Sequence, residues 1–271
     1  MPSGDKMKSA GKRILPLPRG QPSPLSNDGA ITHHNQPGRP QALRKARRRT
    51  KACPMNPQQQ TDWQHRLIAL LEQQPPDNDG AHDLSHLHRV WAVARQLLAQ
   101  YPEADTRVVM AGCYLHDLVN LPKNHAQRQM ASRWSAERAR QLLADSGLSA
   151  AQMDNLAHAI EAHSYSAAIA PRSLEARIVQ DADRMDALGP VGLARMFYVS
   201  GRMGRALAHP LDPLAKQRAT DDQAWAIDHI AVKLAKLPGM MQTDAGRQMA
   251  ERKLQWLLTF RDEFCQDWMA R

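Results

Sequence analysis

An imidazole and a carboxylate stand side by side at His116 and Asp117, where the almost continuously apolar run 108–115 ends. Such a run at the end of a helix indicates burial on nearly all sides. Burying this pair without a partner would cost several kcal/mol. The sequence therefore predicts a partner for the pair, and a cation is the natural one.

Two further stretches offer ligands of the same kind. His86 lies on the flank of the apolar stripe of a predicted helix, 84–98, although a single histidine in that setting is also typical of an ordinary core residue. The stretch 180–186 reads QDADRMD and places Asp181 and Asp183 among core positions. These two side chains point in directions about 200° apart around a helix. The spacing by itself permits either aspartate to join the site.

Together the three stretches offer two imidazole nitrogens and two carboxylates from three helices. This donor set suits Mn²⁺, Fe²⁺, Co²⁺, Ni²⁺ or Mg²⁺, with water in the remaining positions. Since no thiolate takes part, the set is typical of a catalytic metal site and not of a structural one.

The elements that must position these residues are predicted to be helices. Apolar residues recur at helical spacing nearly throughout from Gln58 onward, without an alternating strand pattern or an internal repeat, so the fold is expected to be all-α. Besides 84–98, the predicted helices cover 104–118, 127–146, 151–163, 173–188, 191–206, 222–236 and 244–269. Large side chains at helical spacing are expected in the core, among them Trp91, Trp134, Met185, Met196, Phe197 and Trp256.

Residues 1–54 differ from the rest in composition. They hold 12 of the 36 Lys and Arg residues, two of the 27 acidic residues, eight of the 18 prolines and no aromatic residue. We expect this segment to be a disordered basic tail and 55–271 to be the folded domain. The tail is interpreted as a solvated segment, as a contact for RNA, anionic lipid or a sorting factor, or as residues upstream of a true start at Met55.

Composition also excludes several classes of protein. Because residues 55–271 are close to neutral, the pI near 9.8 belongs to the tail, and a globally basic nucleic-acid-binding fold is excluded. No apolar run approaches the ~18 residues of a membrane span. The three cysteines are far apart and form no CxxC pair, which favours a reducing cytoplasm over a disulfide framework.

The order His86, His116-Asp117, Asp183 resembles the H...HD...D signature of the HD-domain metal-dependent phosphohydrolases. The surrounding words, SHLHRVW (85–91), CYLHDLVNLPKNH (113–125), AIEAHSYSA (159–167) and VQDADRMDALGPVGLARMF (179–197), are similar to those of a bacterial subgroup of uncharacterised HD-domain hydrolases. The similarity covers roughly 60–262. It implies an HD-domain helical bundle for the folded part.

The resemblance also implies a ligand set and a reaction. The metal ligands would be His86, His116, Asp117 and Asp183, because the family places its last ligand in a word like ADRM; Asp181 remains as a supporting or substitute ligand. A divalent metal, Mn²⁺ first among the candidates, lowers the pKa of water and polarises a phosphoryl oxygen. The expected reaction is hydrolysis of a phosphate ester or anhydride.

Several residues of the matched words are candidates for substrate binding. The cations are Arg89, three residues after His86, and Lys123, Arg128 and Arg184. His163 is predicted to contact phosphate or a second metal, or else to be a capping or core histidine.

The proton donor to the leaving group is left open. Some HD nucleotidases carry a glutamate shortly after the HD pair, whereas this chain has Asn120, which cannot act as a general acid or base. Asp181, Asp186 or water would then protonate the leaving group, unless the leaving phosphate needs little protonation.

Related sequences imply a small phosphorylated substrate, with nucleoside triphosphates first, cleaved to a nucleoside monophosphate and pyrophosphate. Phosphomonoesterase and cyclic-nucleotide phosphodiesterase activities are the enzymatic alternatives. A non-catalytic regulator that binds nucleotide or RNA is the alternative from another class. Contact with nucleic acid is expected only through the basic tail, and the oligomeric state is not predicted.

Overall fold

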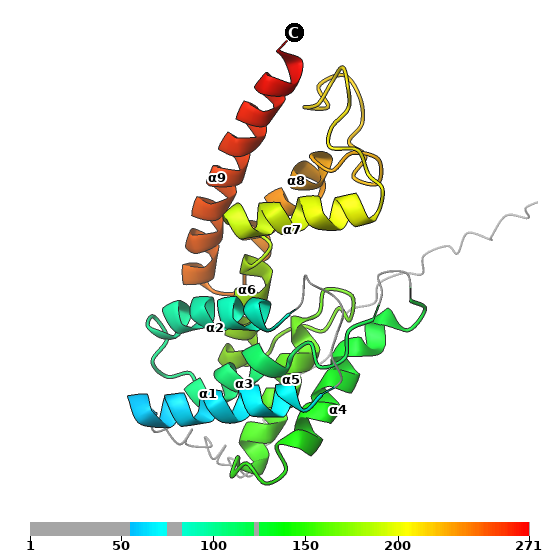
Figure 1. The fold of residues 1–271 in the computed structure, drawn as a ribbon. Coiled ribbons are helices and arrows are strands. Elements are labelled where there is room, and N and C mark those ends of the chain that lie inside the picture. The colour runs from blue at the N-terminus through cyan, green and yellow to red at the C-terminus, as the bar shows by residue number, and fades with distance from the viewer. Residues whose placement is uncertain (1–54, 75–82, 122–124, 271) are drawn as a thin grey trace, which may run out of the picture. The chain divides into compact units, whose positions relative to one another are not determined.

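The computed structural model describes residues 55–74, 83–121 and 125–270. The predicted basic tail and Lys123 lie outside these residues. Within them the chain forms nine α-helices, three short 3-10 helices and no strand, which confirms the all-α prediction (Figure 1). No helix of the described part is both long and apolar enough to cross a membrane.

The helices are α1 (Pro57–Glu72), α2 (Leu84–Leu98), α3 (Thr106–Leu115), α4 (Ala131–Leu142), α5 (Ala150–His163), α6 (Leu174–Met185), α7 (Gly189–Arg202), α8 (Asp228–Val232) and α9 (Asp244–Met269), with 3-10 turns at Arg128–Met130, Leu234–Lys236 and Pro238–Met240. Short polar side chains start several of them. Asp83, Ser149 and Ser173 each accept a hydrogen bond from a backbone N–H of the first turn. These caps satisfy amides that the helix itself leaves without a partner.

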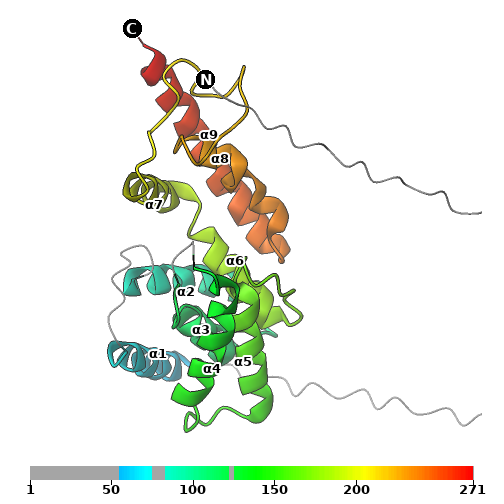
Figure 2. The same cartoon turned by 90° about the vertical axis from the view of Figure 1, so that its right-hand side faces the viewer.

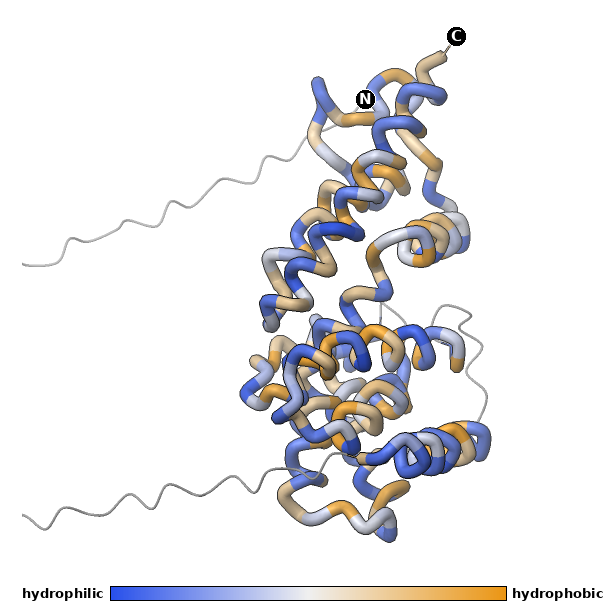
Figure 3. The backbone as a smooth tube through the Cα atoms, turned by 90° about the vertical axis from the view of Figure 1, so that its left-hand side faces the viewer, coloured by the Kyte–Doolittle hydropathy of each residue, from blue (hydrophilic) through white to orange (hydrophobic). Residues whose placement is uncertain are grey.

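Helix α6 connects two groups of helices. It packs against α2, α3 and α5 on one side of the fold and contacts α9 on the other, while α9 in turn packs against α7 (Figures 1 and 2). Each group has its own cluster of buried apolar side chains. Hydrophobic and hydrophilic residues alternate along individual helices, as amphipathic packing requires (Figure 3).

Helix α3 is the exception, because all its residues from 108 to 115 are buried, as predicted. It approaches α6 so closely that a Cβ atom on Gly112 would lie 2.8 Å from Cγ2 of Val179. The absence of a side chain at Gly112 therefore permits the observed spacing of the two helices.

The prediction of one helix over 222–236 is wrong. Only Asp228–Val232 is α-helical there, and the backbone of Lys233 leaves the helical region before a 3-10 turn begins. The buried carboxylate of Asp228 accepts hydrogen bonds from Arg218 at 2.6 and 2.8 Å and from the backbone of Asp221 at 2.7 Å. These bonds hold the preceding segment in an irregular path, because they tie it to the start of α8.

The expectation for the large side chains holds in part. Trp91, Met185 and Met196 are buried, whereas Trp134 and Trp256 are exposed. Helical spacing alone does not distinguish a core aromatic residue from one that stacks along an outer helix face, as Trp256 does on Phe260.

Candidate metal centre

Four elements bring the predicted ligands together. His86 lies in the first turn of α2, His116 follows the last residue of α3 with Asp117 next to it, and Asp183 lies near the end of α6. His163 is the last residue of α5. The three histidines are buried, and the two carboxylates are partly exposed.

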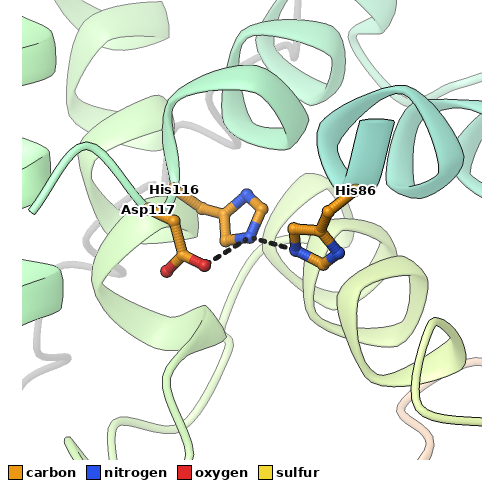
Figure 4. Close-up of side chains that lie close together, drawn as sticks. All are labelled: His86, His116 and Asp117. Atoms are coloured by element: carbon orange, nitrogen blue, oxygen red, sulfur yellow. Dashed lines mark hydrogen bonds and ion pairs between the residues drawn. The ribbon is translucent and has the colours of Figure 1, made fainter. Parts of the chain in front are cut away.

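The Nε2 atoms of His86 and His116 lie 3.3 Å apart at the centre of this group (Figure 4). From Nε2 of His116 the nearest oxygens of Asp117 and Asp183 are at 3.5 and 3.6 Å. Nε2 of His163 lies 3.4 Å from Oδ1 of Asp117. Two overlapping triads, His86, His116, Asp117 and His116, His163, Asp183, each place their donor atoms within 4.8 Å of one another.

Hydrogen bonds on the far side of each ring fix which nitrogen faces the centre. Nδ1 of His86 lies 2.7 Å from Oδ2 of Asp186. Nδ1 of His116 lies 3.0 Å from the carbonyl oxygen of Cys113, and Nδ1 of His163 lies 2.6 Å from the carbonyl oxygen of Ile160. Because a carbonyl only accepts, Nδ1 of His116 and of His163 carries the proton, and a carboxylate favours the same tautomer in His86. The lone pairs of Nε2 then converge, which is the arrangement of histidines that bind a metal.

The charges of the site favour a cation at this point. Burial lowers the pKa of His116, but the carboxylates of Asp117 and Asp183 outweigh it and raise that pKa well above its ordinary value. Burial raises the pKa of both carboxyls, yet the neighbouring histidines bring each pKa below its usual value. The two carboxylates thus favour a positive charge at Nε2 of His116. A divalent ion bound by imidazole nitrogens and carboxylate oxygens would supply that charge in place of the proton.

Asp186 supports the site from behind His86. Its carboxylate accepts hydrogen bonds from Arg89 at 2.7 and 3.0 Å and from Arg195 at 2.6 Å, in addition to its contact with His86. Burial raises the pKa of Asp186, but the hydrogen bonds from His86 and Arg89 outweigh it and lower the pKa to about 2. Asp186 is therefore an ionised acceptor at neutral pH.

Asp181 belongs to a different region. Its buried carboxylate accepts hydrogen bonds from the backbone N–H groups of Gln242 at 2.7 Å and Thr243 at 2.9 Å, and from the Thr243 hydroxyl at 2.7 Å. These contacts attach α6 to the start of α9. Of the two aspartates that the helical spacing left open, Asp183 is the one whose carboxylate lies beside the histidines.

A cavity of about 490 Å³ opens over Asp117, His163 and Asp183. Of the cations predicted for substrate binding, Arg128 and Arg184 line this cavity. Arg89 does not, since it binds Asp186.

The cavity has a second wall that the motifs did not indicate. It includes Arg195 of α7, Arg205, and a stretch with Asp222, His229 and Lys233. The sequence indicates this wall only through the spacing of His229 and Lys233, which are four residues apart and would share one face of a helical turn.

Comparison with known proteins identifies the family. The sequence model of the HD domain matches residues 83–188. The Bacillus subtilis protein YpgQ is 30% identical over 188 residues, which cover 68% of this chain and 83% of YpgQ. The chain belongs to the HD-domain family. This confirms the resemblance that the motifs carried.

Solved structures of HD-domain proteins share the fold. An HD-superfamily hydrolase of Bacillus thuringiensis has a TM-score of 0.59 and 26% identity, over 78% of this chain and 99% of that one. The complex of YpgQ with ADP has a TM-score of 0.55 and 26% identity, over 76% of this chain and 93% of YpgQ. All five donor residues fall within the matched HD domain, whereas the second wall of the cavity lies beyond residue 188.

Proposed function

We propose that this HD-domain protein is a divalent-metal-dependent hydrolase of phosphoanhydride or phosphoester bonds, with nucleoside triphosphates as its first substrates. One observation carries the proposal: three of the converging donors, Asp117, His163 and Asp183, line a cavity that arginine and lysine side chains also line. A cation site beneath a basic cavity matches the charge of a metal-bound phosphate substrate. The ADP complex of YpgQ supports a nucleotide as the ligand.

His86, His116, Asp117 and Asp183 are the proposed metal ligands, with His163 beside them. When bound, a divalent cation supplies a Lewis acid that activates water and neutralises phosphoryl charge. Mn²⁺ is the first candidate, followed by Mg²⁺, Co²⁺, Ni²⁺ and Fe²⁺, because the donors are imidazoles and carboxylates.

Arg128 and Arg184 are proposed to bind phosphoryl oxygens. Both side chains line the cavity, and each already donates to a backbone carbonyl, Arg128 to Leu121 and Arg184 to Met240 at 2.6 Å. These bonds hold the guanidinium groups in place before a substrate arrives, which reduces the entropy lost on binding.

Asp186 and Arg89 are proposed to position His86, because they contact it or its carboxylate partner and do not line the cavity. A carboxyl group with a pKa of about 2 is ionised near neutrality and does not donate a proton. Asp181 is bound to the backbone of residues 242 and 243. Water is therefore the proposed proton source for the leaving group.

The test is a substrate panel measured with each of the five metals and with a chelator. Nucleoside triphosphates, monophosphates and cyclic nucleotides are compared, and the products are analysed for pyrophosphate and orthophosphate. We expect Mn²⁺-dependent release of pyrophosphate from triphosphates. Absence of turnover with every metal and substrate would contradict the proposal and favour a protein that only binds nucleotides.

A further inference from the structure

The second wall of the cavity carries a histidine and a lysine four residues apart in the sequence. His229 lies in α8, and Lys233 follows the last residue of that helix, with its backbone N–H donating to the carbonyl of His229 at 3.0 Å. Both side chains line the cavity that Asp117 and Asp183 also line. They lie beyond the residues that match the HD domain.

Lys233 differs from the other cations of the cavity. Arg128, Arg184, Arg195 and Arg205 each donate a hydrogen bond to a protein acceptor. Among the residues that the structure describes, no acceptor or carboxylate pairs with the ammonium group of Lys233. A cation that lines a cavity without a protein partner is suited to bind an anion from solution.

Charged groups from both parts of the cavity act on this ammonium group. Lys233 is exposed to solvent, yet desolvation by the surrounding cavity lowers the pKa of its ammonium group; Arg128 and Arg195 lower it further, and Asp183 and Asp222 raise it. Lys233 and Asp183 both line the cavity, and no ion pair within 4.0 Å joins them. The cavity of about 490 Å³ provides the space for an anionic group that both parts can contact.

A neighbouring contact holds the same wall in place. Nδ1 of His229 lies 2.7 Å from Oδ2 of Asp222, which fixes the orientation of the imidazole ring. Arg205, which follows α7, donates a hydrogen bond to the side chain of Gln223 at 2.9 Å. This bond connects the residue next to Asp222 to a separate segment of the chain. The wall therefore presents fixed groups to a ligand, which favours specific binding.

We propose that Lys233 and His229 form a subsite for a second phosphoryl group of the substrate, next to the one placed over the metal centre, and that this subsite selects phosphoanhydrides over monophosphates. The inference rests on the proposed hydrolase function and names the element that recognises its substrate. A monophosphate fills the position over the metal centre and leaves Lys233 without an anion. A substrate with two or more linked phosphates reaches both walls.

The experiment measures binding by the metal-loaded full-length protein, with imidodiphosphate and inorganic phosphate as probes. Lys233→Met removes the charge, and Lys236→Met is the matched control, since Lys236 is exposed three residues further on and does not line the cavity. We expect Lys233→Met to weaken imidodiphosphate binding roughly 10- to 100-fold, the loss typical of one hydrogen bond to a charged group. Phosphate binding should change less than about threefold, the control should match the wild type, and Lys233→Arg should restore most of the affinity.

Equal losses for the two probes, or no loss for either, would overturn the subsite. So would a wild-type protein that binds imidodiphosphate no more tightly than phosphate. His229→Gln provides an independent variant, and it should also weaken only the diphosphate analogue. Turnover separates this inference from the proposed function: a wild type inactive on every phosphate contradicts the function, whereas an active wild type whose preference for triphosphate over monophosphate survives Lys233→Met contradicts only the subsite.

Discussion

The two walls of the cavity differ in how their charged groups are arranged. On the HD-domain wall, the donors of three buried histidines and two aspartates converge within a few ångströms of one another, and each ring is held from behind. On the second wall, the cavity is lined by Arg205, His229 and Lys233, which come from three different positions of the chain beyond the HD domain. The first arrangement suits a small cation, and the second suits an extended anion.

This difference indicates a division of tasks along the chain. The donors of the HD-domain wall are held by α2, α3, α5 and α6, which share one core cluster, whereas most of the second wall comes from irregular segments and the short helix α8. Rigid helices hold donors at fixed distances, and irregular segments tolerate changes in shape and charge. We therefore expect substitutions on the first wall to abolish chemistry and those on the second to alter substrate choice.

The largest expected effect comes from the HD pair itself. His116→Ala or Asp117→Ala removes a proposed ligand, and each variant should lose nearly all bound metal and turnover while keeping its helical content. Metal analysis and circular dichroism measure both properties. Chelation of the wild type should have the same effect, reversed by Mn²⁺. If either variant retained both metal and activity, the proposal that His116 and Asp117 bind the metal would be contradicted.

Next in size is the contrast between the two aspartates of α6. Asp183→Ala should empty the metal centre. Asp181→Ala should leave metal binding largely intact but lower the free energy of unfolding by about 3 kcal/mol, because two backbone amides and a hydroxyl lose their acceptor. Metal content and denaturant unfolding of both variants measure the contrast. Metal bound normally by the first variant and lost from the second would reverse the assignment.

Asp186→Asn should weaken metal binding by roughly 10- to 100-fold, the usual loss when a carboxylate behind a ligating histidine is removed. It should also destabilise the fold by about 2 kcal/mol at neutral pH. The folded pKa of about 2 lies below the unfolded value near 3.9, so this stabilisation is complete above pH ~4 and is lost as the pH falls towards 2. Unfolding curves should show the wild type and the variant converging over that interval, and a constant difference between them would contradict the role of the ionised carboxylate.

The smallest expected effect concerns a region outside both walls. A shortened chain that begins at Met55 should keep the thermal midpoint and the metal-dependent activity of the full chain, because the composition of residues 1–54 separates them from the helical pattern. Calorimetry and turnover provide the comparison. A change of more than a few-fold in turnover would show that the first 54 residues contribute to the folded domain.

The sequence was sufficient to predict the all-α fold and the family. It also indicated which of its twelve histidines belong to a site, because His116 stands beside a carboxylate at the end of a buried helix, and His86 and the stretch 180–186 offer further ligands of the same kind. The choice of Asp183 over Asp181 came from the family resemblance and stays a prediction about ligation. Asp181 has a different reason to be in the core, because its carboxylate accepts hydrogen bonds from the backbone of residues 242 and 243.

The second wall was beyond prediction for a physical reason. Its shape depends on side-chain contacts within an irregular segment, such as the ion pair of Arg218 with Asp228 ten residues later, and neither periodicity nor a motif marks them. The same contacts explain why a continuous helix over 222–236 was predicted and not found. Arg89 was expected to meet substrate, but its proximity to His86 in sequence is equally compatible with a contact to Asp186, which the structure shows.

The contact between Gly112 and Val179 bears on the spacing of the proposed metal ligands. Gly112 lies one turn before His116, and Val179 lies one turn before Asp183, so this contact sets the separation of the two ligand-bearing helices. An added methyl group would lie 2.8 Å from Cγ2 of Val179, closer than such carbon atoms approach, so the valine or one of the two helices would have to move. The glycine at position 112 thus keeps the helices that carry His116 and Asp183 at their observed separation.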